Sequence, residues 1–370
     1  MTNQLSIAVL PGDGIGLEVT PAALAVVDAA LAAAGAPGLH KDTLHVGAQA
    51  FLDTGTDFSD EAKSACEAAD GIYLGAIGLP SVRKADGTEI VPQIELRFMF
   101  DLYAGVRPTR AIPGVPTPLA DPRAEKIDFA LVRESTEGLF ASVGKGVIEG
   151  NERAIDTQII TRATTEKVSR FAFDLAARRA AKRDAPRVRK VTLIDKANVF
   201  ASFAFMRKVF DEVADTRDIP AERLYVDAST LAFLGKPWDF DVIVTENMFG
   251  DILSDLAAGL VGGMGYAPSA DIGDTHAVFQ PAHGSAPDIM GTGKANPTAA
   301  ILSGALMVEW LAERHDIAPM ADAARLIEDA VDRAFASGSL RTCELGGQSG
   351  VREVTDLVLA EIGTGAGKAG

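Results

Sequence analysis

The chain has 370 residues and a formal net charge of −16 at pH 7. This length exceeds what one hydrophobic core usually serves, so we expect two lobes. The negative charge argues against nucleic acid or an anionic membrane as a partner, because both would repel the protein. Cys66 and Cys343 lie far apart in the sequence, which favours a reducing compartment, the cytoplasm, over a disulfide framework.

Short apolar runs and helical patterns alternate along the chain. The first strand is predicted at 5–10, followed by a glycine-rich turn at 11–16 and a helix over 18–34. Prolines at 113, 116, 118 and 122 predict a loop over 112–122. The alternation predicts an α/β architecture. Further strands are expected at 71–75, 127–132, 190–195, 223–227 and 240–245, and further helices at 60–69, 164–182, 198–214, 249–261, 297–313, 319–335 and 351–361.

The turn Pro11-Gly12-Asp13-Gly14-Ile15-Gly16 resembles a dinucleotide-binding loop only in part. The fingerprint G-x-G-x-x-G requires a third glycine, and Leu17 or Val19 stands at that position, depending on which glycine is counted first. A tight turn that needs positive φ is an equally good interpretation. We therefore expect a nucleotide site elsewhere in the chain.

Three arginines follow or lie within apolar segments, at positions 97, 107 and 133. A guanidinium group binds a carboxylate through two parallel hydrogen bonds, so three of them together could clamp a multiply charged acid. Any one of them alone would more often be a surface residue. The hypothesis depends on a partner constellation of acids.

Asp251 and Asp255 stand four residues apart at the start of a predicted helix, and hence on one face. Two adjacent anions repel, and a hard divalent cation such as Mg²⁺ or Mn²⁺ would reverse that cost. Acids at a helix start are also favoured by the helix dipole, which is the simpler alternative. A third acid, Asp227, is predicted at the end of a strand. Lys196, after another strand, is a candidate base or a solvated surface lysine.

Taken together, these motifs resemble the β-decarboxylating dehydrogenases of the isocitrate/isopropylmalate type. The resemblance runs from the glycine turn to the helix after Asn296-Pro297 and is most specific at Thr245-Glu-Asn-Met-Phe-Gly-Asp-Ile-Leu-Ser-Asp255. It implies a two-domain α/β fold of that family rather than the usual Rossmann fold. One domain would comprise 1–102 plus 262–370 and the other 103–261. It also implies a homodimer with shared active sites.

The resemblance implies a role for each candidate residue. Arg97, Arg107 and Arg133 match the family's substrate clamp, and Asp227, Asp251 and Asp255 match its metal ligands. Lys196 and Asp227 would be the catalytic pair and would come from the other subunit. NAD would bind the loop after residue 282, where Asp288 would accept hydrogen bonds from ribose and repel a 2′-phosphate. The cofactor residues would be His283, Gly284, Ser285, Ala286, Asp288, Ile289 and Asn296.

The implied reaction oxidises C2 of a malate-type substrate with hydride transfer to NAD⁺ and then releases the β-carboxylate. Substrate choice would depend on residues before Arg97, where Ile90, Val91 and Ile94 favour an apolar or small group at C3. Isopropylmalate leads, malate and tartrate follow closely, and homoisocitrate or isocitrate are further alternatives. The family usually has a tyrosine where Phe140 stands, so another proton donor is expected here.

Two other classes of protein compete with this interpretation. A catalytically silent regulatory subunit should have lost an arginine, a metal carboxylate or the lysine, and all seven of these residues are present. An ordinary Rossmann 2-hydroxyacid dehydrogenase is disfavoured by the missing third glycine.

Overall fold

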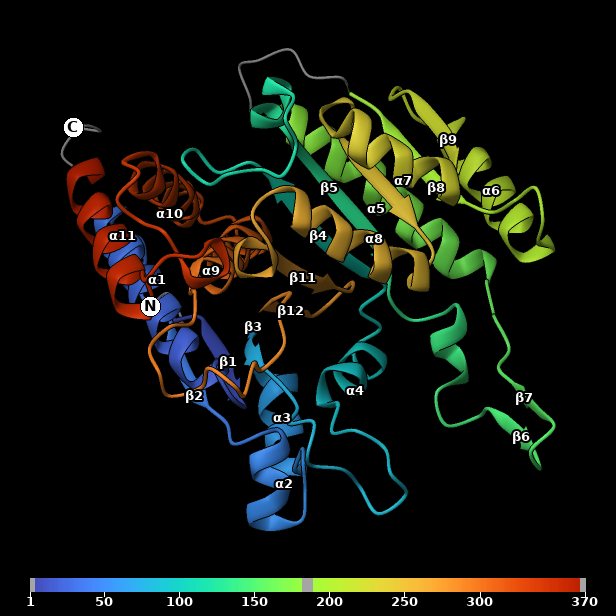
Figure 1. Ribbon diagram of the computed structural model, residues 1–370, viewed down its shortest axis with the longest axis horizontal. Helices are drawn as coiled ribbons and strands as arrows, with labels where there is room; N and C mark the ends of the chain where they lie inside the picture. Colours follow the sequence, from blue (N-terminus) through green and yellow to red (C-terminus); the bar gives the residue numbers. More distant parts are fainter. Residues whose placement is uncertain (1–3, 182–188, 367–370) are drawn as a thin grey trace.

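The computed structural model describes residues 4–181 and 189–366, and its centre is one ten-stranded sheet (Figure 1). The strand order is β2-β1-β3-β12-β11-β4-β5-β10-β8-β9. A separate two-stranded arm, β6 and β7, projects from the body. The strands are β1 Ser6–Gly12, β2 His40–Thr43, β3 Gly71–Ala76, β4 Ala104–Arg110, β5 Asp128–Glu134, β6 Val147–Glu149, β7 Arg153–Ile155, β8 Val191–Asp195, β9 Ala221–Tyr225, β10 Val242–Thr245, β11 Pro268–Ile272 and β12 Ala277–Pro281.

Helices cover both faces of this sheet. In the half that contains both chain ends, α1, α9, α10 and α11 form one layer (Figure 1), and their apolar faces make a core with Ile7, Tyr73 and Phe279 of the strands. In the other half, α5 and α6 pack on one face and α8 on the opposite face. The helices are α1 Gly16–Ala33, α2 Ala48–Thr54, α3 Asp60–Ala68, α4 Pro92–Met99, α5 Arg162–Ala181, α6 Ala201–Ala214, α7 Val226–Gly235, α8 Asn247–Leu260, α9 Thr298–His315, α10 Ala318–Ala336 and α11 Val351–Ala366.

Helix α1 is the one helix in the described part of the chain that is long and apolar enough to cross a membrane. It packs in the first core, where Val19, Ala23 and Val26 are fully buried. Burial in the protein core therefore accounts for its apolar sequence.

The α/β class predicted from the alternation is confirmed, and every predicted strand and helix has a counterpart within a few residues. One strand end was wrong. The strand expected to end at Asp227 is β9, which ends at Tyr225, and Asp227 lies in the first turn of α7. The sequence pattern did not predict β2, β4, the β6–β7 arm, β11, β12 or the short helices α2, α4 and α7.

Strands β2, β1, β3 and β12 run opposite to β5, β10, β8 and β9, and β11 and β4 lie between these two groups. Strand β11 pairs antiparallel with both β12 and β4, and β4 pairs antiparallel with β5. The predicted domain division falls between β11 and β4, and the sheet continues across it. Asp271 of β11, Gly105 of β4 and Arg133 of β5 are register partners and form a row across the junction. Because laterally paired residues share a sheet face, this row places two charged side chains on one side of the junction.

The glycine turn after β1 lets two loops pack closely, the turn itself and the loop that contains Ser285. Gly14 has φ +57°, and a Cβ there would lie 2.0 Å from the Ser285 carbonyl oxygen. The amide of Ile15 donates a hydrogen bond to the same carbonyl, at 2.8 Å. The tight-turn interpretation is therefore confirmed, and the turn supports the loop in which the cofactor residues were predicted.

Candidate active site

The three predicted arginines converge on one cavity of about 200 Å³. Arg97 reaches it from α4, Arg107 from β4 and Arg133 from the end of β5. Asp251 and Asp255 of α8 line the same cavity, as do His283 and Gly284 of the loop after β12. The structure thus brings together the arginine clamp, two of the three predicted metal ligands and the start of the predicted cofactor loop.

A buried aspartate that the sequence reasoning missed holds two of these arginines. Asp271 accepts a hydrogen bond from Arg97 Nε at 2.9 Å and another from Arg107 Nη2 at 3.1 Å. Its side chain is only 2% exposed. Burial alone would favour the neutral acid, but the charges of Arg97 and Arg107 outweigh it and lower the pKa of Asp271 to about 2. Asp271 is therefore ionised at neutral pH.

Arg133 is fixed by three neighbours. Its Nε donates to Asn247 Oδ1 at 2.9 Å, and its Nη1 donates to Asp251 Oδ1. Its guanidinium carbon lies 5.0 Å from the centre of the Phe140 ring. Burial, with a smaller effect from the charge of Arg97, lowers the pKa of Arg133 to about 10, so it stays protonated at neutral pH. Phe140 therefore supplies an aromatic surface to the clamp.

Asp251 and Asp255 lie on the cavity side of α8, as the four-residue spacing predicts. Burial and the charge of Asp251 raise the pKa of the Asp255 carboxyl. Such a pair suits a hard cation, because the cation would offset both the repulsion and the lost hydration. Among the residues that the structure describes, however, no three His, Cys, Asp or Glu side chains form a group that could hold a metal.

The third predicted ligand lies away from this cavity in the same chain. Asp227 is paired with Lys196, whose Nζ lies 2.5 Å from Asp227 Oδ1. The hydrogen bond from Lys196 lowers the pKa of Asp227. The Asp227 side chain is 67% exposed. The two predicted catalytic residues are thus neighbours, but they do not line the clamp cavity of their own chain.

The predicted cofactor loop follows β12 and is held by several hydrogen bonds. His283 Nδ1 lies 2.9 Å from the Gly284 carbonyl oxygen, and its buried Nε2 has no partner in the described part of the chain. Burial lowers the pKa of His283, which favours the neutral ring. With Nδ1 as the donor, Nε2 is an acceptor available to a hydroxyl. Ala286 has φ +39° and begins a turn that contains the exposed Asp288 and is closed by a hydrogen bond from the Ile289 amide to the Ala286 carbonyl.

Other predicted cofactor residues have structural contacts. Ser285 Oγ donates to the Gly78 carbonyl, and Ile289 packs against the first core. The Asn296 amide nitrogen donates to Glu344 at 2.7 Å, and its oxygen accepts from Thr298. The Asn296 side chain is therefore already engaged in hydrogen bonds within the protein.

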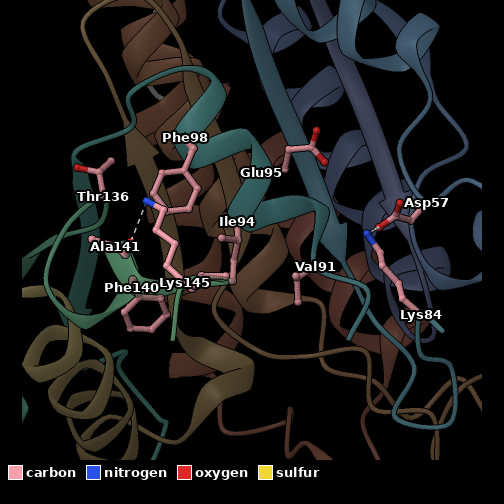
Figure 2. Close-up of a pocket in the computed structure, with 11 residues that line it drawn as sticks. Asp57, Lys84, Val91, Ile94, Glu95, Phe98, Thr136, Phe140, Ala141 and Lys145 are labelled. Atoms are coloured by element: carbon pink, nitrogen blue, oxygen red, sulfur yellow. Dashed lines mark hydrogen bonds and ion pairs between the residues drawn. The ribbon is translucent and has the colours of Figure 1, made fainter. Parts of the chain in front are cut away.

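A second cavity, of about 500 Å³, opens beside α4 (Figure 2). Val91 and Ile94 line it together with Phe98 and Phe140. Ile90 does not. It is 2% exposed and packs with Ala48 and Val82. The expectation that Ile90 contacts a ligand is therefore corrected, because its side chain belongs to a small core beneath the cavity.

Gln93 is a residue whose position the sequence did not reveal. It lines the clamp cavity with Arg97, one helical turn away on α4. Its Oε1 is buried and makes no hydrogen bond within the described residues. A buried acceptor without a partner is costly, so a donor on a bound molecule would improve this position.

The fold is that of an α/β protein whose cavity, beside the junction of the two halves of the sheet, gathers three arginines and two carboxylates. Comparison with known proteins identifies the family. The model for the isocitrate/isopropylmalate dehydrogenases matches residues 6–358. The chain belongs to this family, whose members are decarboxylating hydroxyacid dehydrogenases.

Individual relatives agree with the family model. The chain is 40% identical to a 3-isopropylmalate dehydrogenase of Corynebacterium kroppenstedtii, covering 92% of this chain and 97% of that one. It is 39% identical to a 3-isopropylmalate/3-methylmalate dehydrogenase of Methanocaldococcus jannaschii, covering 96% and 98%. The crystal structure of isocitrate dehydrogenase from Methylococcus capsulatus superimposes with a TM-score of 0.82 at 35% identity, covering 97% and 99%. The predicted fold class and enzyme class are confirmed.

The packing of Arg133 on α8 generates a stability prediction. A Cβ at Gly250 would lie 2.6 Å from Arg133 Cγ and 2.7 Å from Arg133 Cβ, whereas one at Gly259 of the same helix meets nothing within 4 Å. We expect Gly250→Ala to lower the free energy of unfolding by about 1–3 kcal/mol through overpacking. Gly259→Ala should raise it by roughly 0.5–1 kcal/mol through helix propensity. Urea unfolding of both variants measures this, and equal shifts would contradict the packing argument.

Proposed function

We propose that this chain catalyses the NAD-dependent, Mg²⁺- or Mn²⁺-dependent oxidative decarboxylation of a 3-substituted malate, with 3-isopropylmalate as the leading substrate. The convergence of three arginines and two carboxylates on one cavity carries this proposal. The arginines suit the two carboxylates of a malate, and Asp251 and Asp255 suit a hard cation beside its hydroxyl. The names of the relatives in Corynebacterium and Methanocaldococcus support the substrate class.

The cofactor sites fit the residues present. Asp251 and Asp255 are two of the three carboxylates of the predicted metal site, and the pKa of Asp255 is raised. The unpartnered Nε2 of His283 offers an acceptor to a ribose hydroxyl. When bound, the cation would polarise the C2 hydroxyl and NAD⁺ would accept the C2 hydride. The exposed carboxylate of Asp288 would favour NAD over NADP, because it would repel a 2′-phosphate.

The side chains then have distinct tasks. Arg97, Arg107 and Arg133 hold the substrate carboxylates and fix the orientation of C2. Lys196 in its neutral amine form, or its partner Asp227 through a water molecule, takes the hydroxyl proton as C2 loses its hydride. Loss of the β-carboxylate as CO₂ leaves a carbon that must gain a proton, and Phe140 cannot supply one. A group other than residue 140 is therefore the donor at this step.

The separation of Lys196 and Asp227 from their own cavity supports a homodimer with shared sites. Exposed apolar side chains gather on α7 and α8, with Leu231 at 73%, Leu234 at 55% and Ile252 at 64% exposure. These two helices are in contact, and Asp227 is in the first turn of α7. Ile148, on the projecting β6–β7 arm, is 79% exposed (Figure 1). Such surfaces are typical of obligate interfaces, and the partner would deliver its Lys196 and Asp227 to this cavity.

Three further parts of the proposal follow from the same features. The site takes a small-molecule acid, and nucleic acid and membranes are not partners of a chain with net charge −16. The free thiols of Cys66 and Cys343 agree with a cytoplasmic location. A silent regulatory subunit is disfavoured, because the clamp arginines and both α8 carboxylates are assembled in the cavity.

One observation favours a second substrate, a malate whose C3 group can donate a hydrogen bond, as in tartrate. Gln93 lines the clamp cavity, and its buried Oε1 has no hydrogen-bond partner within the described residues, so an isopropyl group would leave it unpaired. The larger cavity beside α4, with Val91 and Ile94, offers apolar surface instead. The two observations point to different C3 groups.

The function is tested by following NADH formation with Mn²⁺ and a panel of 3-isopropylmalate, 3-methylmalate, D-malate, tartrate and isocitrate. We expect turnover with at least one of the first four and a requirement for the cation. NADP in place of NAD⁺ should give a lower kcat/KM by roughly tenfold or more, because of Asp288. Absence of turnover with every acid, in a folded protein that contains Mn²⁺, would refute the proposed function.

Gln93→Leu separates the two substrate candidates. Removing the buried amide should raise kcat/KM for isopropylmalate, on the order of tenfold relative to tartrate, because one unpaired polar group costs about 1–3 kcal/mol. Steady-state kinetics on both acids measure this ratio. The matched control is Gln49→Leu, which alters an exposed glutamine outside the cavity and should leave the ratio unchanged. Gln280→Leu is not a suitable control because Gln280 contacts Asp271. A Gln93→Leu ratio equal to that of the unaltered protein would remove the role given to Gln93.

Shared active sites predict complementation between two inactive variants. Lys196→Met and Arg133→Met should each abolish turnover, since they remove the base and part of the clamp. After the two chains are mixed, unfolded and refolded together, half of the dimers would be mixed, and each would have one intact site. About a quarter of the unaltered activity should then return. Mixing Lys196→Met with Lys196→Ala is the matched control and should return none. Failure of the first mixture to recover activity, although mixed dimers form, would place both residues in one chain's site.

A further inference from the structure

Asp271 has a place in the site that the reaction as described does not use. It lies on β11, in the half of the sheet with both chain ends, and the Arg107 that it binds lies on β4 in the other half. Its second partner, Arg97, comes from α4. Gln280 of β12 completes its surroundings with a hydrogen bond of 3.3 Å. One buried carboxylate thus holds guanidinium groups from both lobes side by side.

The hydrogen bonds leave part of the clamp open for a ligand. Arg97 uses Nε for Asp271, and its two Nη groups make no hydrogen bond within the described residues. Arg107 directs Nη2 to Asp271 and Nη1 to the carbonyl oxygens of Val106 and Ala270. Asp271 therefore fixes both side chains without covering the Arg97 edge that faces the cavity.

The charges around the cavity balance when Asp271 is counted. Among the side chains that line the cavity or form ion pairs with its arginines, three arginines are positive and three aspartates, Asp251, Asp255 and Asp271, are negative. The ion pair of Lys196 and Asp227 has no net charge, so it does not change this balance in whichever subunit's cavity it lies. A dianionic malate together with a divalent cation adds no net charge to such a site. A tricarboxylate with the same cation would add one uncompensated negative charge, and enclosing an unpaired charge is costly.

We propose that Asp271 is a specificity-determining positioning residue, which sets the charge of the clamp so that it selects dianionic malates with an uncharged C3 group over tricarboxylates. This inference rests on the proposed function, because it assumes that the cavity binds a malate-type acid with a divalent cation. Asp271 acts through Arg97 and Arg107 and touches no reacting atom. Its charge, rather than its volume, is the determinant.

The test is the equilibrium binding of 3-isopropylmalate and of isocitrate in the presence of Mg²⁺, measured by titration calorimetry without NAD. Asp271→Asn keeps the shape and an acceptor oxygen but removes one negative charge. The ratio of the two dissociation constants should move toward isocitrate, on the order of tenfold, as expected for one unit charge across a partly buried cleft. The shift should shrink in high salt. A merely structural role would weaken both ligands alike.

Asp332→Asn is the matched control. Asp332 binds Arg110 on the same strand as Arg107, outside the clamp, at 2.6 and 2.8 Å, and its loss should leave the ratio unchanged. An unchanged ratio in Asp271→Asn would overturn the inference while leaving the proposed function intact. If the unaltered protein binds neither acid, the proposed function is refuted, and so is the inference that rests on it. If Asp271→Asn does not fold, the two dissociation constants of the unaltered protein are the test. Equally tight binding of isocitrate and isopropylmalate by that protein would overturn the inference.

Discussion

The buried contact of Asp271 with Arg97 and Arg107 is the interaction on which the rest of the site depends. The two arginine side chains are 10% and 9% exposed, so burial of their charges without a partner would be costly. Asp271 provides that partner and is itself kept ionised by them. Its register with Gly105 and Arg133 then brings the third arginine onto the same face of the sheet. The antiparallel junction between the two halves of the sheet is thus also the place where the three clamp arginines meet.

Sequence patterns predicted the parts of the site that lie within one element. The spacing of Asp251 and Asp255 on α8, and the place of Arg133 at the end of β5, follow from local periodicity. Asp271 could not be found in this way, because its partners are 174 and 164 residues away and its short strand gives little signal. Strand β4 was also missed, since its Gly105 and Pro108 are unfavourable in strands. The misplacement of Ile90 has a similar origin, because the burial of a residue before a helix start depends on tertiary packing.

For a strongly acidic protein to bind an anion, positive side chains must be gathered at the binding site, and most of its negative side chains must lie away from that site. The structure meets this need by burial. The three clamp arginines are among the most buried charged residues of the chain, whereas most of its ion pairs are exposed. In a partly buried cavity the effective dielectric constant is low, so groups that line the cavity act on a bound acid more strongly than the screened charges at the surface. The net charge of −16 is therefore compatible with the proposed binding of an anion in this cavity.

The exposed pair of Lys196 and Asp227 extends this argument to assembly. An ammonium group placed beside the clamp within one chain would add a positive charge to a site that is already balanced, and a carboxylate would oppose it. Delivered together from a second chain, the pair adds both at once and leaves the balance intact. The proposed sharing of sites is therefore compatible with an enclosed site that carries no net charge before or after the cation and a dianionic acid enter. A monomer would retain a clamp that can hold an acid but would lack the base that removes its hydroxyl proton.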